Sequence, residues 1–156
     1  MASGRLSAGI LLWRRRARRL EVLLGHPGGP FFARKDAGVW SVLKGEASAD
    51  DEDLELLARR EFEEETGHRA PEGPTIALGE VRQAGGKVVH CWAIEGDLDP
   101  ERASSNTFEL EWPPRSGATQ EFPEIDRVAW FDLTTARDKV NAAQITFLER
   151  LEDALR

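Results

Sequence analysis

The stretch REFEEETG, from Arg60 to Gly67, places four carboxylates within five residues. It closes a predicted helix over residues 50–66, for which Ser48 and Asp50 are capping candidates and the acidic first turn suits the helix dipole. Gly67 is the residue type that commonly ends a helix. Both boundaries of this acidic helix are marked in the sequence, so its dense negative charge is the feature that needs a physical explanation.

The predicted helix changes character along one face. Its first half carries an apolar stripe at Leu54, Leu57 and Ala58. At 100° per residue, the same stripe continues through Glu61, Glu64 and Glu65. Like charges three or four positions apart cost roughly 0.2 to 0.5 kcal/mol per pair, and partial burial raises that cost or forces protonation. A hard divalent cation removes the penalty because it seeks carboxylate oxygens. We therefore interpret these three glutamates as metal ligands, with a solvated acidic face as the alternative.

Other kinds of cation site fit the sequence poorly. Residues 50–62 lack the mid-loop glycine and the alternating ligands of a calcium-binding EF-hand loop. The three histidines, His26, His68 and His90, are scattered along the chain, and there is only one cysteine. A zinc site is therefore not expected.

Length and composition restrict the class of protein. A chain of 156 residues is typical of one domain with its own core, so we expect a single domain over residues 1–156. The formal charge of -7 argues against a nucleic-acid partner held by a general basic surface. Cys91, the only cysteine, excludes an intramolecular disulfide, and we expect a buried side chain in a reducing, cytoplasmic setting. No apolar run approaches 18 residues, so no membrane-spanning segment is expected.

Short apolar runs predict strands over residues 6–13, 20–24, 39–43, 75–82, 87–94, 109–112 and 127–131. The proline-rich segment 113–123 predicts a long surface loop. Apolar residues at three- and four-residue spacing predict a second helix over residues 135–154, which serves as structural cover for the sheet. Many strands with few helices between them indicate an α/β fold in which a mixed sheet is flanked by helices.

Arginines dominate one connection between two predicted strands, over residues 14–19. Such a cluster could contact nucleic acid or another anionic partner. Because the cluster is only six residues long and the rest of the chain is acidic, we interpret it as a solvated turn.

The segment from Gly45 through Glu52 to Gly67 resembles the Nudix box, which is a Gly, a Glu and then Arg-Glu-aliphatic-any-Glu-Glu-any-Gly-aliphatic. Seven residues separate Glu52 from Arg60, as the family pattern requires. Two departures are visible. Six residues rather than five separate Gly45 from Glu52, and Phe62 and His68 stand where aliphatic residues are usual. Most of the chain is also similar to a bacterial Nudix group described as predicted NTP pyrophosphohydrolases.

The resemblance implies an α/β/α sandwich with a mixed sheet and hydrolysis of a nucleoside diphosphate linked to another group X. It implies Mg²⁺ as cofactor, with Mn²⁺ as a possible substitute, held by Glu61, Glu64 and Glu65. A backbone carbonyl near Lys44 or Gly45 would complete the metal site. Arg60 would orient the helix glutamates, and Glu52 and Gly67 would serve the motif structurally. Together these roles give Arg60, Glu61 and Glu64 as catalytic residues.

The general base is the least defined part of this expected site. Members of the family use either a glutamate of the box or one from a loop outside it. Glu121 and Glu124 precede the last predicted strand and can return to the site, and we expect Glu121 to act as the base. Lys44 and Gly45 are expected to bind substrate phosphates, and Arg34 and Lys35 are weaker candidates for the same role.

The expected activity is a magnesium-dependent pyrophosphohydrolase acting on a small nucleotide-type molecule, such as a nucleoside triphosphate or a dinucleoside polyphosphate. One alternative is a catalytically silent Nudix domain that binds a nucleotide or regulates a partner. A second is a calcium-responsive interaction module built on the acidic helix. The first alternative is disfavoured because such domains usually lose box carboxylates and this chain keeps them. The substrate and the oligomeric state stay open.

Overall fold

A computed structural model describes residues 5–48, 50 and 53–156. Six strands of this described part form one sheet, in the order β4-β5-β1-β2-β8 with β3 also paired to β1. Their bounds are β1 Leu6–Arg16, β2 Arg19–Pro27, β3 Leu43–Glu46, β4 Thr75–Arg82, β5 Val88–Glu95 and β8 Ile125–Asp132. β1 runs parallel to β5 and antiparallel to β2 and β3, so the sheet is mixed, as the sequence predicted. Glu52, the expected structural glutamate of the box, lies outside the described residues.

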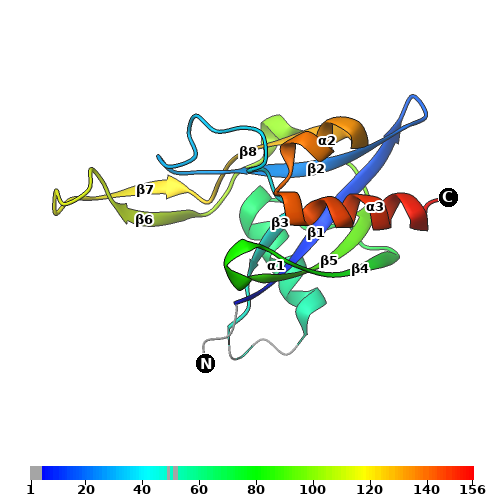
Figure 1. Cartoon of the computed structure of the whole chain (residues 1–156), viewed down its shortest axis with the longest axis horizontal. Helices are drawn as coiled ribbons and strands as arrows, with labels where there is room; N and C mark the ends of the chain where they lie inside the picture. Colours follow the sequence, from blue (N-terminus) through cyan, green and yellow to red (C-terminus); the bar gives the residue numbers. More distant parts are fainter. Residues whose placement is uncertain (1–4, 49, 51–52) are drawn as a thin grey trace.

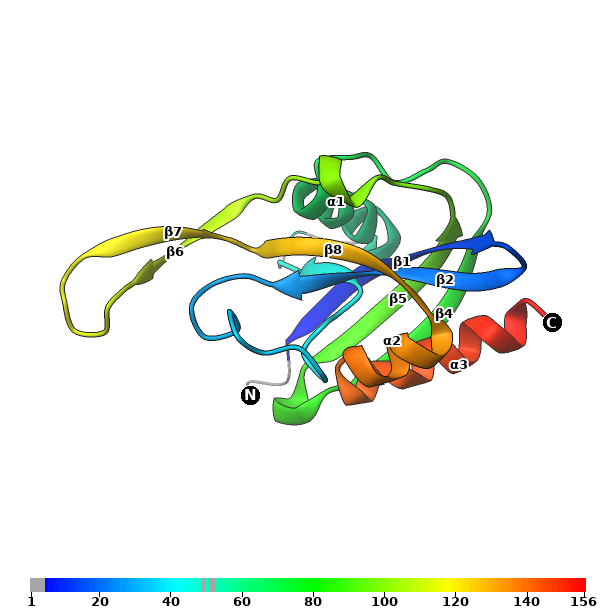
Figure 2. The ribbon, with the colours of Figure 1, turned by 90° about the horizontal axis from the view of Figure 1, so that it is seen from above.

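Helices cover both faces of this sheet, which confirms the predicted α/β/α sandwich (Figures 1 and 2). Helix α1 (Leu54–Thr66) lies on one face, and α2 (Leu133–Lys139) and α3 (Ile145–Ala154) lie on the other. β1 is buried on both sides because its apolar residues alternate between the two layers. Ile10 packs in the core cluster under α1, whereas Leu11 packs in the cluster that includes Phe147 of α3. Short 3₁₀ turns at Ala84–Gly86, Pro100–Arg102 and Ala142–Gln144 complete the connections.

A separate two-stranded hairpin extends from the body of the molecule at the left of Figure 1. It consists of β6 (Thr107–Glu111) and β7 (Thr119–Pro123). The expectation of a loop over residues 113–123 is therefore wrong for its second half. Pro123 is tolerated because it is the last residue of its strand and its partner Thr107 is the first residue of β6.

Two further boundaries differ from the sequence prediction. The strand expected over residues 39–43 is displaced to Leu43–Glu46, because Trp40 and Ser41 form only isolated bridges with Val140 and Gly25. The long helix expected over residues 135–154 is broken at Val140, whose backbone is extended. The N–H of Asn141 donates to the carbonyl of Trp40 at 2.8 Å, so a tertiary backbone contact replaces a helical one.

The N-cap of helix α1 lies three residues after the last expected capping candidate. Its N-cap is Asp53, whose side chain accepts hydrogen bonds from the N–H groups of Glu55 and Leu56. Ser48 and Asp50 therefore do not cap the helix. Gly67 ends it in the left-handed conformation with φ of 76°, as predicted. None of the helices in the described residues is long and apolar enough to cross a membrane.

Candidate active site

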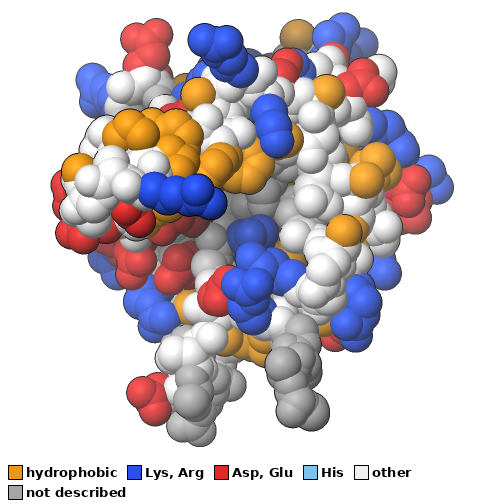
Figure 3. Space-filling view, turned by 60° about the vertical axis from the view of Figure 1, so that its left-hand side comes forward, with side chains coloured by type: hydrophobic (Ala, Val, Ile, Leu, Met, Phe, Trp, Pro, Cys, Tyr) orange, Lys and Arg blue, Asp and Glu red, His pale blue; other side chains and the backbone are white. Residues whose placement is uncertain are grey.

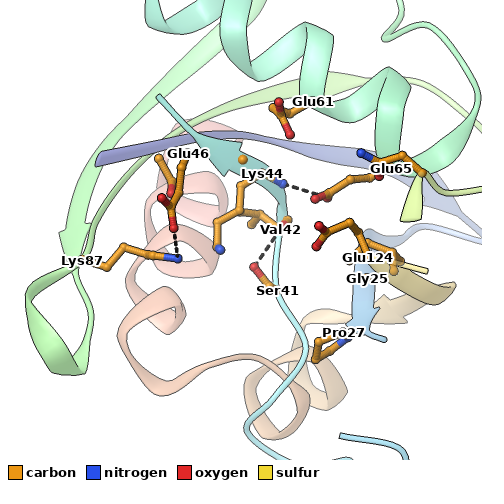
Figure 4. A pocket seen from close by; sticks show the side chains of 14 residues that line it. Gly25, Pro27, Ser41, Val42, Lys44, Glu46, Glu61, Glu65, Lys87 and Glu124 are labelled. Carbon is orange, nitrogen blue, oxygen red and sulfur yellow. Dashed lines mark hydrogen bonds and ion pairs between the residues drawn. The ribbon is translucent and has the colours of Figure 1, made fainter. Parts of the chain in front are cut away.

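A pocket of about 370 Å³ lies where α1, β3 and the start of β8 meet. Its charged lining residues are Lys44, Glu46, Glu61, Glu65, Lys87 and Glu124. Figure 4 shows that they come from opposite sides of β3, with Glu61 on the α1 side and the ammonium groups of Lys44 and Lys87 on the other. The pocket therefore has an acidic side and a basic side, and β3 separates them.

Gly45 permits the close contact between α1 and β3. A Cβ atom at this position would lie 1.9 Å from Oε1 of Glu61 and 2.1 Å from its carboxyl carbon. No real side chain fits at such distances, so only glycine lets the Glu61 carboxylate lie against the backbone of β3. The exposed backbone of Gly45 and the carboxylate of Glu61 consequently share one wall of the pocket.

Glu65 is a buried carboxyl group at the base of the acidic side, with 8% of the residue exposed. Its Oε1 accepts a hydrogen bond from the backbone N–H of Lys44 at 3.1 Å. Burial raises the pKa of Glu65 to about 8, and the nearby carboxylate of Glu61 adds to this rise. The Lys44 ammonium opposes the shift without cancelling it. Without a cation, the folded protein therefore holds Glu65 protonated at neutral pH.

Lys44 links the two sides of the pocket. Its backbone N–H holds Glu65 while its side chain lies on the basic side (Figure 4). Burial lowers the pKa of the Lys44 ammonium, and the neighbouring ammonium of Lys87 lowers it further. Glu65 opposes this effect. Adding a negative ligand beside Lys44 and Lys87 would relieve the repulsion between the two cations.

Carboxylate oxygens suit a hard divalent cation, and the acidic side of the pocket presents such oxygens. Glu61, Glu65 and Glu124 line the same pocket, and the space left by the missing Cβ of Gly45 is filled by one of their carboxylates. Two of these residues also raise the pKa of the third, which means that their charges act on one another. Among the described residues, these three glutamates do not form a compact group that could hold a metal ion. The carboxylate oxygens of these residues are the ligand type that suits Mg²⁺ or Mn²⁺.

The comparison with known families agrees with this geometry. The family model of the NUDIX domain matches residues 4–151. The chain belongs to the Nudix hydrolase family. No curated protein matches the chain, so the closer comparisons are with solved structures.

Nudix structures from distant organisms share the fold along nearly the whole chain. The NUDIX domain of NrtR from Shewanella oneidensis, complexed with ADP ribose, has a TM-score of 0.67 at 19% identity, covering 100% of this chain and 91% of that one. The C. elegans Ap4A hydrolase has a TM-score of 0.62 at 19% identity, covering 98% and 99%. A mutT/nudix family protein from Listeria innocua has a TM-score of 0.64 at 17% identity, covering 99% and 96%. At these identities the similarity shows the fold alone.

The structure separates the three predicted Nudix glutamate ligands. Glu61 and Glu65 line the pocket, but Glu64 does not. Glu64 is exposed, with Oε2 3.9 Å from Nε of Arg60 and Oε1 accepting a hydrogen bond from Nδ2 of Asn106 at 3.4 Å. The buried face of α1 passes through Phe62 and Thr66 instead. The buried face of α1 is therefore rotated slightly from the predicted apolar stripe. The prediction leaves out Phe62, whose large apolar side chain is buried.

The two candidate bases lie in different places. Glu121 is an exposed residue of β7, paired with Glu109 in the hairpin, and it does not line the pocket. Glu124 follows the hairpin and does line it. The backbone N–H of Glu124 donates to the carbonyl of Asn106 at 2.9 Å, which fixes the base of the hairpin beside the pocket. A catalytic role for Glu121 stays a prediction, and Glu124 has the better position.

Sequence reasoning missed several pocket residues, among them the polar residues Ser7, Glu46, Lys87 and Asn106. Arg34 and Lys35, by contrast, are exposed and do not line the pocket. One signal for the missed residues was available, since Lys44 and Glu46 alternate along a strand and so share a face. The position of Lys87 depends on the pairing of β1 with β5, which residue spacing alone does not reveal.

Proposed function

We propose that this Nudix protein is a divalent-metal-dependent pyrophosphohydrolase that cleaves the phosphoanhydride link of a nucleoside diphosphate derivative. One observation carries the proposal. Two carboxylates of α1, Glu61 and Glu65, meet the backbone of β3 at Lys44 and Gly45 inside a pocket that also holds lysine side chains. Acid groups for a cation and ammonium groups for phosphates are thus present in one cavity.

Glu61 and Glu65 would hold the cation, with Glu124 beside Glu65 in the same pocket (Figure 4). The expected role of Glu64 as a further helix ligand stays a prediction, since Glu64 is exposed and does not line the pocket. A bound Mg²⁺ would neutralise the diphosphate and lower the pKa of an attacking water. Mn²⁺ prefers the same oxygen ligands and is expected to substitute.

The residues of the chain would then perform the remaining steps. Lys44 would bind non-bridging oxygens of the phosphate chain and so help to position the substrate. Glu124 would accept a proton from the water as its oxygen forms the new bond to phosphorus. The bond from phosphorus to the bridging oxygen breaks in the same step, and the departing phosphate carries away the electron pair. Arg60 would keep Glu64 oriented at the edge of the site.

Two phosphoanhydride compounds should be tested first as substrates. ADP ribose and Ap4A are named for two of the structurally similar proteins, and both contain the bond that this pocket is suited to cleave. We further propose that residues 1–156 act as a single cytoplasmic domain, supported by the family match over most of the chain and by the buried Cys91. The expectation of no nucleic-acid partner stays a prediction based on the net charge.

The test is release of nucleotide products from ADP ribose, Ap4A and nucleoside triphosphates, with Mg²⁺ and with a chelator. Glu61→Gln and Glu65→Gln should each reduce kcat at least about a hundredfold, because each removes a charged ligand. Glu63→Gln is the matched control, since Glu63 is exposed on the same helix and does not line this pocket. Glu64→Gln decides whether the exposed glutamate also takes part.

Two results would contradict the proposal. One is turnover that persists in the chelator. The other is equal loss of activity in Glu63→Gln and Glu65→Gln, which would indicate a general effect of helix charge rather than a metal site.

A further inference from the structure

A buried hydroxyl group on the basic side of the pocket has no hydrogen-bond partner among the residues that the structure describes. Ser7 is fully buried, and no described residue makes a hydrogen bond with its Oγ. Ser7 lines the pocket. An unsatisfied buried hydroxyl is costly, and native proteins rarely keep one without a ligand or a functional reason.

Strand register brings cationic groups to this hydroxyl. Ser7 of β1 pairs with Glu46 of β3 and, on its other side, with Val89 of β5. Gly9 pairs with Lys44, so Ser7, Lys44 and Glu46 share one face of the sheet. Lys87 has an extended backbone two residues before Val89 and belongs to that face as well.

Gly9 is what leaves room for Lys44. A Cβ at position 9 would lie 2.8 Å from Cβ of Lys44 and 2.7 Å from the carbonyl oxygen of Leu43. Because Gly9 has no side chain, the aliphatic part of the Lys44 side chain can pass over β1 and reach the basic side of the pocket. In Figure 4 the ammonium groups of Lys44 and Lys87 point toward the same space.

The basic side keeps excess positive charge. Lys87 Nζ lies 3.5 Å from Oε2 of Glu46, and the same oxygen lies 3.4 Å from Nη1 of Arg5. Lys87 and Arg5 therefore share the carboxylate of Glu46, and Lys44 lies on the same face of the sheet. Figure 3 shows Lys and Arg side chains bordering a hollow on the face from which the hairpin comes forward.

We propose that Ser7 Oγ, Lys44 and Lys87 form a subsite for a second, strongly anionic phosphate group of the substrate. This phosphate lies across β3 from the carboxylates Glu61 and Glu65, so it is not the one that the metal ion holds. The subsite favours substrates with a phosphate chain of three or more groups, such as nucleoside triphosphates or dinucleoside polyphosphates. Nucleotide sugars, whose second group X is uncharged, leave the subsite empty. This inference rests on the proposed function for its substrate class.

The subsite itself is tested by binding, without catalysis. Inorganic tripolyphosphate is titrated into the protein by calorimetry at constant salt, with chelator present so that no metal bridges the two. Lys87→Met should weaken binding about tenfold or more, and Lys87→Arg should restore much of it, because one charge-assisted hydrogen bond is lost and regained. Lys139→Met removes a positive charge outside the pocket and is the control for net charge.

Two further variants separate a binding role from a structural one. Ser7→Ala should weaken tripolyphosphate binding while the melting temperature stays equal or rises, because it removes an unsatisfied buried hydroxyl. Glu46→Gln should tighten binding, since it removes the carboxylate that competes for Lys87. If Ser7→Ala lowers stability and leaves binding unchanged, or if Lys87→Met and Lys139→Met weaken binding equally, the subsite proposal is wrong.

Kinetics then test the substrate class. For Lys87→Met, the ratio of kcat/KM for a dinucleoside tetraphosphate to that for a nucleotide sugar should fall about tenfold. An unchanged ratio overturns the assignment of substrate class. If no phosphoanhydride is hydrolysed but tripolyphosphate binding still depends on Ser7 and Lys87, the proposed function fails while the anion subsite stands.

Discussion

At the scale of single residues, the site contains a carboxyl group whose charged form water would stabilise but which is buried in the folded protein. This group is Glu65, and burial raises its pKa from 4.5 to about 8. Such a group contributes stability in full below its unfolded pKa and loses that contribution as the pH rises through the folded value. The metal-free protein should therefore be most stable, with respect to this group, on the acidic side of neutrality.

This behaviour gives a measurable pH profile. The melting temperature of the metal-free protein should fall as the pH rises from about 4.5 to about 8, and Glu65→Gln should flatten the profile. Mg²⁺ must displace the same proton, so its apparent affinity should increase with pH up to about 8. Glu63→Gln, which removes an exposed carboxylate, should keep the slope of the native protein. An unchanged slope in Glu65→Gln would show that another group titrates.

At the scale of elements, α1 determines where the acidic side of the pocket lies. Its N-cap is the carboxylate of Asp53, at the end of the helix opposite Glu61 and Glu65. Because helix ends depend on such side-chain partners, losing the cap should loosen the first turn rather than the site itself.

Asp53→Ala should therefore lower the free energy of unfolding by about 1 kcal/mol, as measured by urea denaturation. Asp53→Asn, which keeps an oxygen acceptor, should recover most of that loss. Mg²⁺ affinity should stay near that of the native protein in both variants. A large loss of Mg²⁺ affinity in Asp53→Asn would mean that the cap also contributes to the metal site.

The elements also show what the sequence could predict. The acidic helix and most strands were predictable because apolar periodicity and glycine positions are local signals. The break at Val140 and the displacement of β3 were not, since both result from backbone contacts with residues distant in sequence. The same limit applies to the site. Glu61 and Glu65 follow from the box, whereas Lys87 and Ser7 enter through the pairing of β1 with β5 and β3.

At the scale of the whole molecule, the β6–β7 hairpin is an arm attached to a compact sandwich (Figure 2). Its own sheet makes no strand pairs with the main sheet among the described residues. Trp112 packs edge-on against Phe31, an exposed residue of the loop that follows β2, with ring centroids 5.5 Å apart. The arm therefore contacts the loop that follows β2 and contributes no residue to either core cluster.

Replacing residues 108–122 with a short turn tests this division. The melting temperature should change little, because the backbone bond between Glu124 and Asn106 already closes the base of the arm. Mg²⁺ binding should persist, because no residue of this segment lines the pocket, while KM for nucleotide substrates should increase because the segment lies between the lining residues Asn106 and Glu124. Phe31→Ala serves as a milder comparison. Global unfolding of the shortened chain would show that the arm is part of the cooperative unit.

The tight contact at Gly45 also has a consequence for how this gene can change. Every amino acid reached from a glycine codon by one nucleotide substitution carries a Cβ, and any Cβ at this position would meet the Glu61 carboxyl group. No neutral mutational step should therefore leave this position. In a saturation library selected for activity, codon 45 should recover glycine almost alone. Codon 85, where a Cβ would meet nothing within 4 Å, should accept asparagine despite its positive φ of 87°.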